Sequence, residues 1–170
     1  MKLAQCIILD LLKDYDPVPI LPETCDFHFS GVQLLDQDNP TDDPSILYIG
    51  TTTQISSFDT EKLKDFCIIC IGKKEDVSSY IENYQANLIL IPENHSLASV
   101  VNTLYTGFHR ILRWDAELQN AILSKQNYQS LFSIGGRFFG KNAMLMVNSS
   151  YNVIGTNLLE APGHEKLDSF

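Results

Sequence analysis

Short apolar runs recur along the first half of the chain and predict strands. They cover residues 29–35, 46–49, 66–71 and 88–91. The last three runs carry no charge, which is typical of strands buried on both faces of a sheet. The segments around them predict helices at residues 3–13, 58–65 and 75–84. Strands that alternate with helices predict an α/β fold, with a mainly parallel sheet of about four strands and flanking helices.

From residue 97 the apolar positions recur in alternating steps of four and three. The series is Leu97, Val101, Leu104, Phe108, Ile111, Leu118 and Ile122, and Asp115 interrupts it. This spacing predicts a heptad seam on one long helix over residues 97–130, which would connect two domains and hold a homodimer together. The alternative is a core helix that lies across the sheet, and the two interpretations can hold for different halves of the helix.

The end of the chain predicts a hairpin, with strands at 143–148 and 152–156. A lone hairpin is marginal in water, so its other strands are expected from elsewhere. We therefore expect three parts: an α/β domain over 1–96, the connecting helix over 97–130, and the truncated start of a second domain over 131–170.

Charge and composition narrow the classes of partner. The formal net charge is −9 and no basic stripe offsets it, so direct nucleic-acid contact is not expected. No signal peptide is evident, and no apolar segment approaches the roughly 18 to 20 residues that a membrane span requires. Four cysteines suit a reducing compartment. These features predict a soluble cytoplasmic protein without membrane contact.

Three short motifs lack the setting that their chemistry requires. Residues 135–142 nearly match a phosphate-binding loop, but a predicted helix precedes them and a strand follows, so we interpret them as a glycine helix end and turn. Cys67 and Cys70 lie three apart on a strand and would point to opposite faces, which predicts core positions. The acidic loop 36–43 has Pro40 where a calcium loop needs glycine. No catalytic residue, metal site or cofactor is predicted.

Candidate ligand-binding residues follow from position in the predicted sheet, because ligands of open parallel sheets bind beyond the carboxyl ends of the strands. The residues at those ends are Asp36, Gly50, Thr51, Thr52, Lys73, Lys74, Glu93 and His95. Hydroxyls, helix N-terminal amides and two lysines could hold a small anion or a polar metabolite. The alternative is that Gly and Thr there form turns and helix caps.

The order of these segments resembles a known family. Residues 31–36, 46–51 and 88–92, which run into the helix of Trp114, resemble the N-terminal domain of PucR-type (purine-catabolism regulator) transcription factors of bacteria. Residues 139–154 are similar to the opening of that family's middle, GAF- or PAS-like α+β domain, although Asn148 stands where Asp is usual. The resemblance implies a metabolite-sensing domain, a middle domain, and a C-terminal helix-turn-helix that has no counterpart in these 170 residues.

Three functions are therefore open. The first is a non-catalytic part of a transcription regulator that senses a small metabolite and forms a dimer. The second is a small enzyme or carrier for an acidic or phosphorylated metabolite, which would use Lys73, Lys74 and His95. The third is a protein-interaction module in which the long helix is the whole function.

Overall fold

The computed structural model divides the chain into two compact units, Met1–His109 (unit 1) and Arg110–Phe170 (unit 2). The structure describes the residues 2–20, 27–36, 43–58, 63, 66–84, 87–139 and 145–156. The division falls within the long helix, so residues 97–109 of that helix belong to unit 1 and residues 110–123 to unit 2. The domain boundaries expected at residues 96 and 130 stay predictions.

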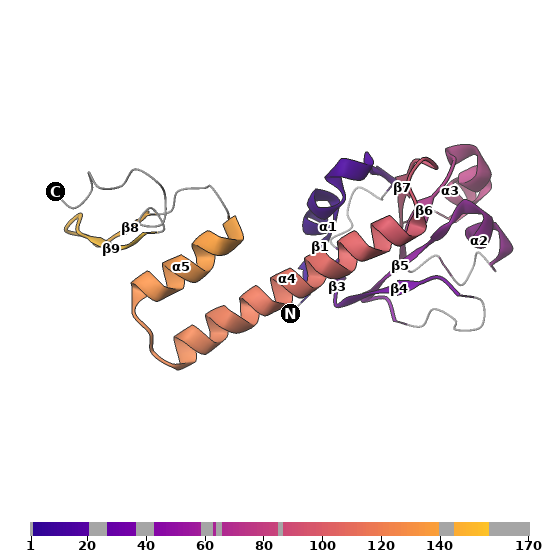
Figure 1. Ribbon diagram of the computed structural model, residues 1–170. Helices are drawn as coiled ribbons and strands as arrows, with labels where there is room; N and C mark the ends of the chain where they lie inside the picture. The colour runs from indigo at the N-terminus through magenta and orange to yellow at the C-terminus, as the bar shows by residue number, and fades with distance from the viewer. Residues whose placement is uncertain are drawn as a thin grey trace. The chain divides into compact units, whose positions relative to one another are not determined.

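Unit 1 is built on a five-stranded sheet with the strand order β2–β7–β6–β5–β4 (Figure 1). The strands are β2 (Val18–Ile20), β4 (Gly31–Leu34), β5 (Ile46–Thr51), β6 (Cys67–Ile71) and β7 (Asn87–Ile91). The strands β4 to β7 run parallel, and β2 pairs with β7 in the antiparallel direction. The predicted α/β class and mainly parallel sheet are thus confirmed, but the sheet is mixed and has five strands.

Three predictions near these strands need correction. The strand predicted at residues 29–35 is divided between β3 (His28–Phe29) and β4, which belong to different sheets. The segment around Pro19 was interpreted only as a helix stop, whereas Val18–Ile20 forms an edge strand, where proline is tolerated. The predicted helix over residues 3–13 is preceded by the short strand β1 (Leu3–Ala4), which pairs with β3 (His28–Phe29), so the helix α1 covers only Gln5–Leu11.

The helix α2 was not predicted, and it precedes the helix predicted at residues 58–65. It spans Thr52–Ser57 and ends at Phe58, whose backbone is extended, so the prediction is wrong at Phe58. Thr51 caps α2, which explains why a helix begins directly after β5. Residues 59–62 and 64–65 of the prediction lie outside the described residues. The helix predicted at 75–84 is confirmed as η3 (Lys74–Val77) followed by α3 (Ser78–Tyr84).

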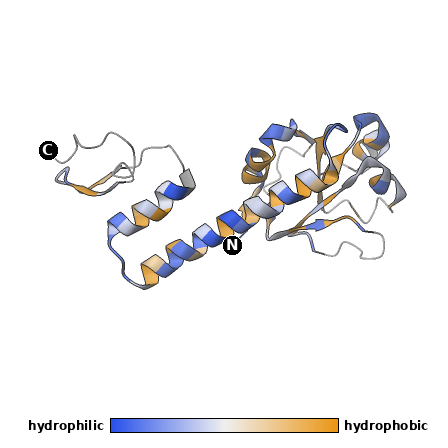
Figure 2. Ribbon diagram, in the orientation of Figure 1, coloured by the Kyte–Doolittle hydropathy of each residue, from blue (hydrophilic) through white to orange (hydrophobic). Residues whose placement is uncertain are grey.

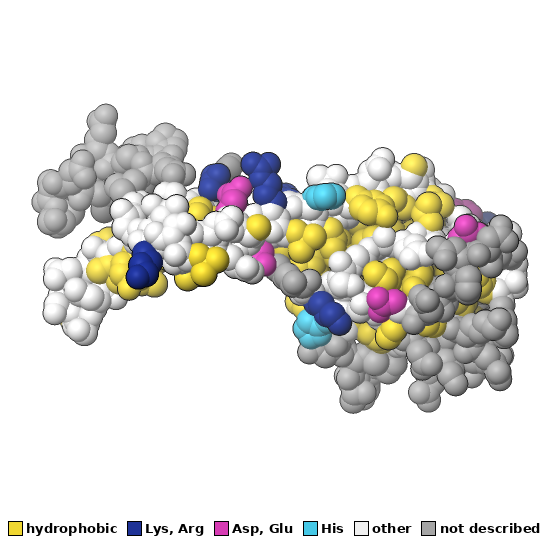
Figure 3. All heavy atoms as spheres, turned by 90° about the horizontal axis from the view of Figure 1, so that it is seen from below, with side chains coloured by type: hydrophobic (Ala, Val, Ile, Leu, Met, Phe, Trp, Pro, Cys, Tyr) yellow, Lys and Arg dark blue, Asp and Glu magenta, His cyan; other side chains and the backbone are white. Residues whose placement is uncertain are grey.

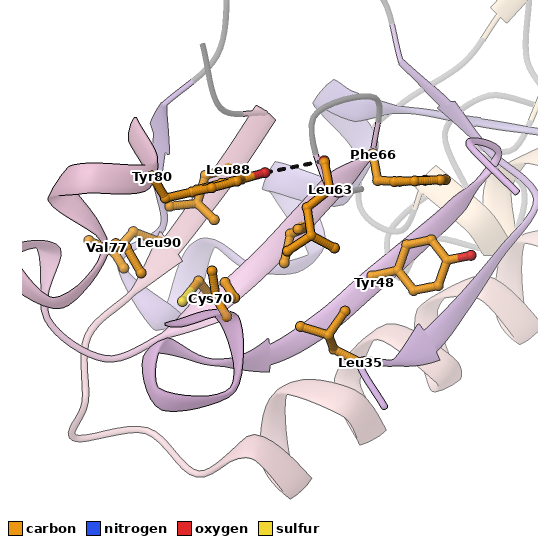
Figure 4. Close-up of a cluster of buried hydrophobic side chains, with 11 residues drawn as sticks. Leu35, Tyr48, Leu63, Phe66, Cys70, Val77, Tyr80, Leu88 and Leu90 are labelled. Carbon is orange, nitrogen blue, oxygen red and sulfur yellow. Dashed lines mark hydrogen bonds between the residues drawn. The ribbon is translucent and has the colours of Figure 1, made fainter. Parts of the chain in front are cut away.

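One face of the sheet is covered by α2, η3 and α3. A cluster of eleven buried residues joins these helices to the strands, and Figure 4 shows it with its members drawn as sticks. Within it the Tyr80 hydroxyl donates a hydrogen bond to the Leu63 carbonyl oxygen at 3.2 Å. Cys70 belongs to this cluster and Cys67 is also fully buried. The prediction that both cysteines are core residues is confirmed.

The helix α4 spans Leu97–Leu123. Its first part crosses the strands in Figure 1 and, together with α1, covers the opposite face of the sheet. Leu104 and Phe108 are only 0% and 5% exposed. A side chain at Gly107 would lie 2.6 Å from Leu11 of α1, so the two helices approach closely because this position is glycine. Leu104 and Phe108 of the predicted seam are therefore core positions, which favours the alternative interpretation for this part of the helix, whereas Leu97 and Val101 are half-buried.

The long helix is also shorter than expected. It ends at Leu123, and Lys125 in the left-handed conformation (φ 51°) turns the chain into a new helix, α5 (Tyr128–Phe139). Gly135 and Gly136 lie buried inside α5. The predicted glycine helix end is therefore wrong at Gly135 and Gly136, because packing of α5 outweighs the low helix propensity of glycine. Residues 140–142 of that prediction lie outside the described residues.

Unit 2 consists of the end of α4, α5 and a two-stranded ribbon, β8 (Leu145–Val147) with β9 (Val153–Thr156). The indole Nε1 of Trp114 donates a hydrogen bond to the carbonyl oxygen of Ile134 at 3.2 Å. The Gln129 side chain donates to the carbonyl oxygen of Thr156 at 2.7 Å and accepts from its amide at 3.2 Å. These contacts attach α5 to α4 on one side and to β9 on the other, and the predicted hairpin is confirmed.

Candidate site at the carboxyl edge of the sheet

The carboxyl ends of β5, β6 and β7 lie side by side at one edge of the unit 1 sheet. Thr51, the last residue of β5, pairs with Ile71 of β6, and Ile71 pairs in turn with Ile91 of β7. The residues that follow these three strands therefore gather at this carboxyl edge. Asp36 follows β4, which is three strands away from β7. At about 4.8 Å per strand it lies too far from the end of β7 to share a small ligand with it.

The chain leaves β6 and β7 in opposite directions. After β6 it enters η3 and α3 on the face of the sheet that holds the buried cluster, and after β7 it enters α4 on the other face. Such a divergence between neighbouring parallel strands is where open α/β sheets bind ligands.

A salt bridge spans this point of divergence. Lys73 Nζ lies 3.5 Å from Glu93 Oε1, and the two side chains are 57% and 62% exposed. The backbone amide of Gly72 also donates a hydrogen bond to the Ile91 carbonyl oxygen at 3.0 Å. Sequence analysis predicted both Lys73 and Glu93 as ligand residues, and the structure brings their side chains together. An exposed salt bridge contributes little to stability, so an anionic ligand could displace Glu93 from Lys73 at small cost.

Other predicted ligand residues serve the local fold. Thr51 and Gln54 form a reciprocal cap of α2: the Thr51 hydroxyl accepts from the Gln54 amide at 3.3 Å, and the Thr51 amide donates to Gln54 Oε1 at 2.9 Å. Gly50 lies directly against the Gln54 and Leu35 side chains. Sequence analysis overlooked Gln54, although its place three residues after the capping threonine is a recognisable signal.

Thr52 connects the turns that follow β5 and β6. Its hydroxyl donates a hydrogen bond to Asp76 Oδ2 at 3.1 Å. Gly72 adopts φ +147°, and a Cβ atom there would collide with the same hydroxyl. Lys74 is the first residue of η3 and is exposed. Asp76 was not predicted, and no sequence signal indicated its pairing with a residue 24 positions earlier.

His95 belongs to a second group of contacts, around Tyr15. The Tyr15 ring packs edge-on against the His95 ring with centroids 5.0 Å apart. The Tyr15 hydroxyl lies 2.8 Å from Ser99 Oγ and 2.7 Å from Thr103 Oγ1, so it contacts the first two turns of α4. Ser96 caps the same helix, because its hydroxyl accepts from the Ser99 amide at 3.1 Å. Tyr15 thereby ties the N-terminal segment to the start of α4.

The charged side chains of Lys73, Lys74 and Glu93 are exposed at this edge. Among the described residues, no group of three or more His, Cys, Asp and Glu side chains could hold a metal ion. None of the helices in the described part of the chain is long and apolar enough to cross a membrane.

Comparison with known proteins adds no relative. No family model, no curated protein and no solved structure matches the chain.

Proposed function

We propose that this chain is the non-catalytic, signal-sensing and dimerising part of a bacterial transcription regulator of the PucR type, which responds to a small anionic or polar metabolite. One observation carries the proposal. The helix α4 begins six residues after the end of β7, at the carboxyl edge of the sheet, and continues without a break from unit 1 into unit 2. A change at the carboxyl edge can therefore reach unit 2 along one continuous helix.

The contacts at the start of α4 favour such a relay. Glu93 lies in the turn between β7 and α4. It forms a salt bridge with Lys73, which lies between β6 and η3. A ligand that replaces Glu93 at Lys73 would free this turn to move, and with it the first residues of α4. At 1.5 Å per residue the 27 residues of α4 extend about 40 Å. A ligand can act in this way only if it binds one arrangement of the helix more tightly than another.

The only tryptophan of the chain offers a direct test of the relay. Trp114 lies on α4 in unit 2, half-buried and hydrogen-bonded to α5. Purines, carboxylates and phosphorylated metabolites would be titrated while Trp114 emission is recorded. We expect at least one of them to shift the emission, and Lys73→Ala to weaken that response by at least about tenfold, the usual effect of losing one charged contact.

A matched control exists on the same unit. Lys13 is 67% exposed and forms a comparable exposed salt bridge with Asp10 at 3.7 Å. Lys13→Ala removes the same charge but leaves the Lys73–Glu93 salt bridge intact, so it should leave the response unchanged. Equal losses in the two variants would show that general electrostatic attraction is measured, and the proposed site would be wrong.

A further inference from the structure

Exposed apolar side chains are concentrated on unit 2. Among the described residues, three large hydrophobic side chains are exposed on unit 1, namely Val18, Leu34 and Tyr105. Eight are exposed on unit 2, which has fewer described residues: Leu112, Ile122, Leu123, Tyr128, Met146, Val147, Tyr151 and Val153. We call these eight residues the unit 2 apolar surface. Figures 2 and 3 show hydrophobic residues at the end of α4. Figure 2 also shows them on the two strands β8 and β9.

The unit 2 apolar surface is large enough to matter for association. An aromatic side chain buries about 150–250 Å², and Tyr128 and Tyr151 are 57% and 88% exposed. These two residues alone therefore present about 200–350 Å², out of the roughly 800 Å² that each partner contributes to a stable interface. Val147 and Val153 are cross-strand partners, 45% and 57% exposed, and form an apolar pair on the ribbon.

The distribution of charge indicates which partner fits. Residues 1–109 contain six Lys or Arg and sixteen Asp or Glu, whereas residues 110–170 contain six and five. The formal net charge is thus −10 on unit 1 and +1 on unit 2, out of −9 for the chain. Two copies would repel each other if they met through unit 1, and unit 2 offers a nearly neutral surface with both signs of charge.

We propose that the unit 2 apolar surface is the interface with a second copy of this chain. This inference rests on the dimerising role proposed above and moves the interface away from most of the predicted seam. Leu104, Phe108 and Ile111 are at most 5% exposed and are already packed inside the chain. Ile122, the last position of the predicted seam, is 62% exposed and belongs to the unit 2 apolar surface. Burial of Ile122, Leu123 and Tyr128 against a copy removes apolar area from water without disturbing either core.

Sedimentation equilibrium of the whole chain tests the interface. The wild type should have twice the 19.2 kDa mass of one chain. Ile122→Glu combined with Leu123→Glu should weaken the dimer by at least about tenfold, because it places charges in an apolar contact. Leu123 is 80% exposed, so the change should leave the fold of one chain intact. Far-UV circular dichroism and Trp114 emission check that the variant is folded.

A control variant separates the surface from added charge. Val18→Glu combined with Leu34→Glu adds the same charge on unit 1, at side chains that are 51% and 48% exposed. This variant should remain a dimer. Tyr151→Ser adds no charge and removes the most exposed of the eight side chains, so it should also weaken the dimer. A monomeric wild type, or a dimer that only the unit 1 variant dissociates, would overturn the inference.

Salt distinguishes an apolar interface from an ionic one. From about 0.01 M to about 1 M salt the Debye length falls from about 30 Å to about 3 Å, which screens the repulsion between two acidic units. The dimer should become tighter over this range, and a dimer that dissociates in salt would contradict the apolar interface. The metabolite response of Trp114, measured in the monomeric Ile122→Glu/Leu123→Glu variant, tests the sensing function separately from the interface.

Discussion

Replacing Leu104 by alanine tests whether the first part of α4 is a core helix. Leu104 is 0% exposed and lies one helical turn from Val100 and from Phe108, which are 0% and 5% exposed. Removing a fully buried leucine side chain typically costs about 2–5 kcal/mol, the sum of lost apolar burial and the cavity left behind. Against a total stability of about 5–15 kcal/mol for an ordinary domain, this is a large loss.

Urea unfolding followed by far-UV circular dichroism measures the effect of Leu104→Ala. The experiment is best made in the Ile122→Glu/Leu123→Glu variant, so that dissociation of a dimer does not contribute to the free energy of unfolding. Leu34→Ala in the same variant is the control, since that side chain is 48% exposed and lies outside the proposed interface, and it should cost at most about 1 kcal/mol. A cost below about 1 kcal/mol for Leu104→Ala would refute the assignment of this helix face to the core.

Three further predictions concern the carboxyl edge and the core. Gly72→Ala should destabilise the fold by more than about 1 kcal/mol in urea unfolding, because φ is +147° and the new methyl group would meet Thr52; an unchanged midpoint would contradict the geometry. Tyr15→Phe should cost about 1 kcal/mol and raise hydrogen exchange in the first turns of α4, because the hydroxyl contacts at Ser99 and Thr103 are lost; unchanged exchange there would show that the hydroxyl does not hold α4. Burial raises the pKa of the Cys70 thiol from 9.0 to about 12, so the folded state holds this proton more tightly than the unfolded state, and the corresponding stability should decline as the pH rises from about 9 toward 12. Cys70→Ala should reduce this decline but not abolish it, because burial also raises the pKa of Tyr80; a decline equal to that of the wild type would argue against the role of Cys70.

The strands β5, β6 and β7 were predictable because their burial on both faces leaves a continuous apolar run in the sequence. The strand β2 was not predicted, because Pro19 interrupts the apolar run. Proline is compatible both with a helix stop and with an edge strand, so the sequence did not distinguish the two. Periodicity identified the apolar stripe of α4. The sequence pattern of such a stripe is the same whether it packs on the sheet of its own chain or on a second chain. Burial of Leu104 and Phe108 resolves that ambiguity for the first half of the helix.

The candidate site was predictable only in part. The rule that ligands bind beyond parallel strands pointed to Lys73 and Glu93, which do form a pair. It could not tell that the Thr51 side chain would be used to cap α2. Tyr15 carries no sequence signal for its role, because its hydroxyl contacts lie 84 and 88 residues away along the chain. Long-range contacts of this kind depend on the folded topology and not on local spacing.

Titration of Trp114 emission with an anionic metabolite, in the wild type and in Lys73→Ala, tests the central claim most directly. The account predicts a shift in the wild type that requires at least about tenfold more ligand in the variant, and no such change in Lys13→Ala. Binding at Lys73 that leaves Trp114 unaffected would contradict the relay through α4, and a shift of equal strength in Lys73→Ala would contradict the site.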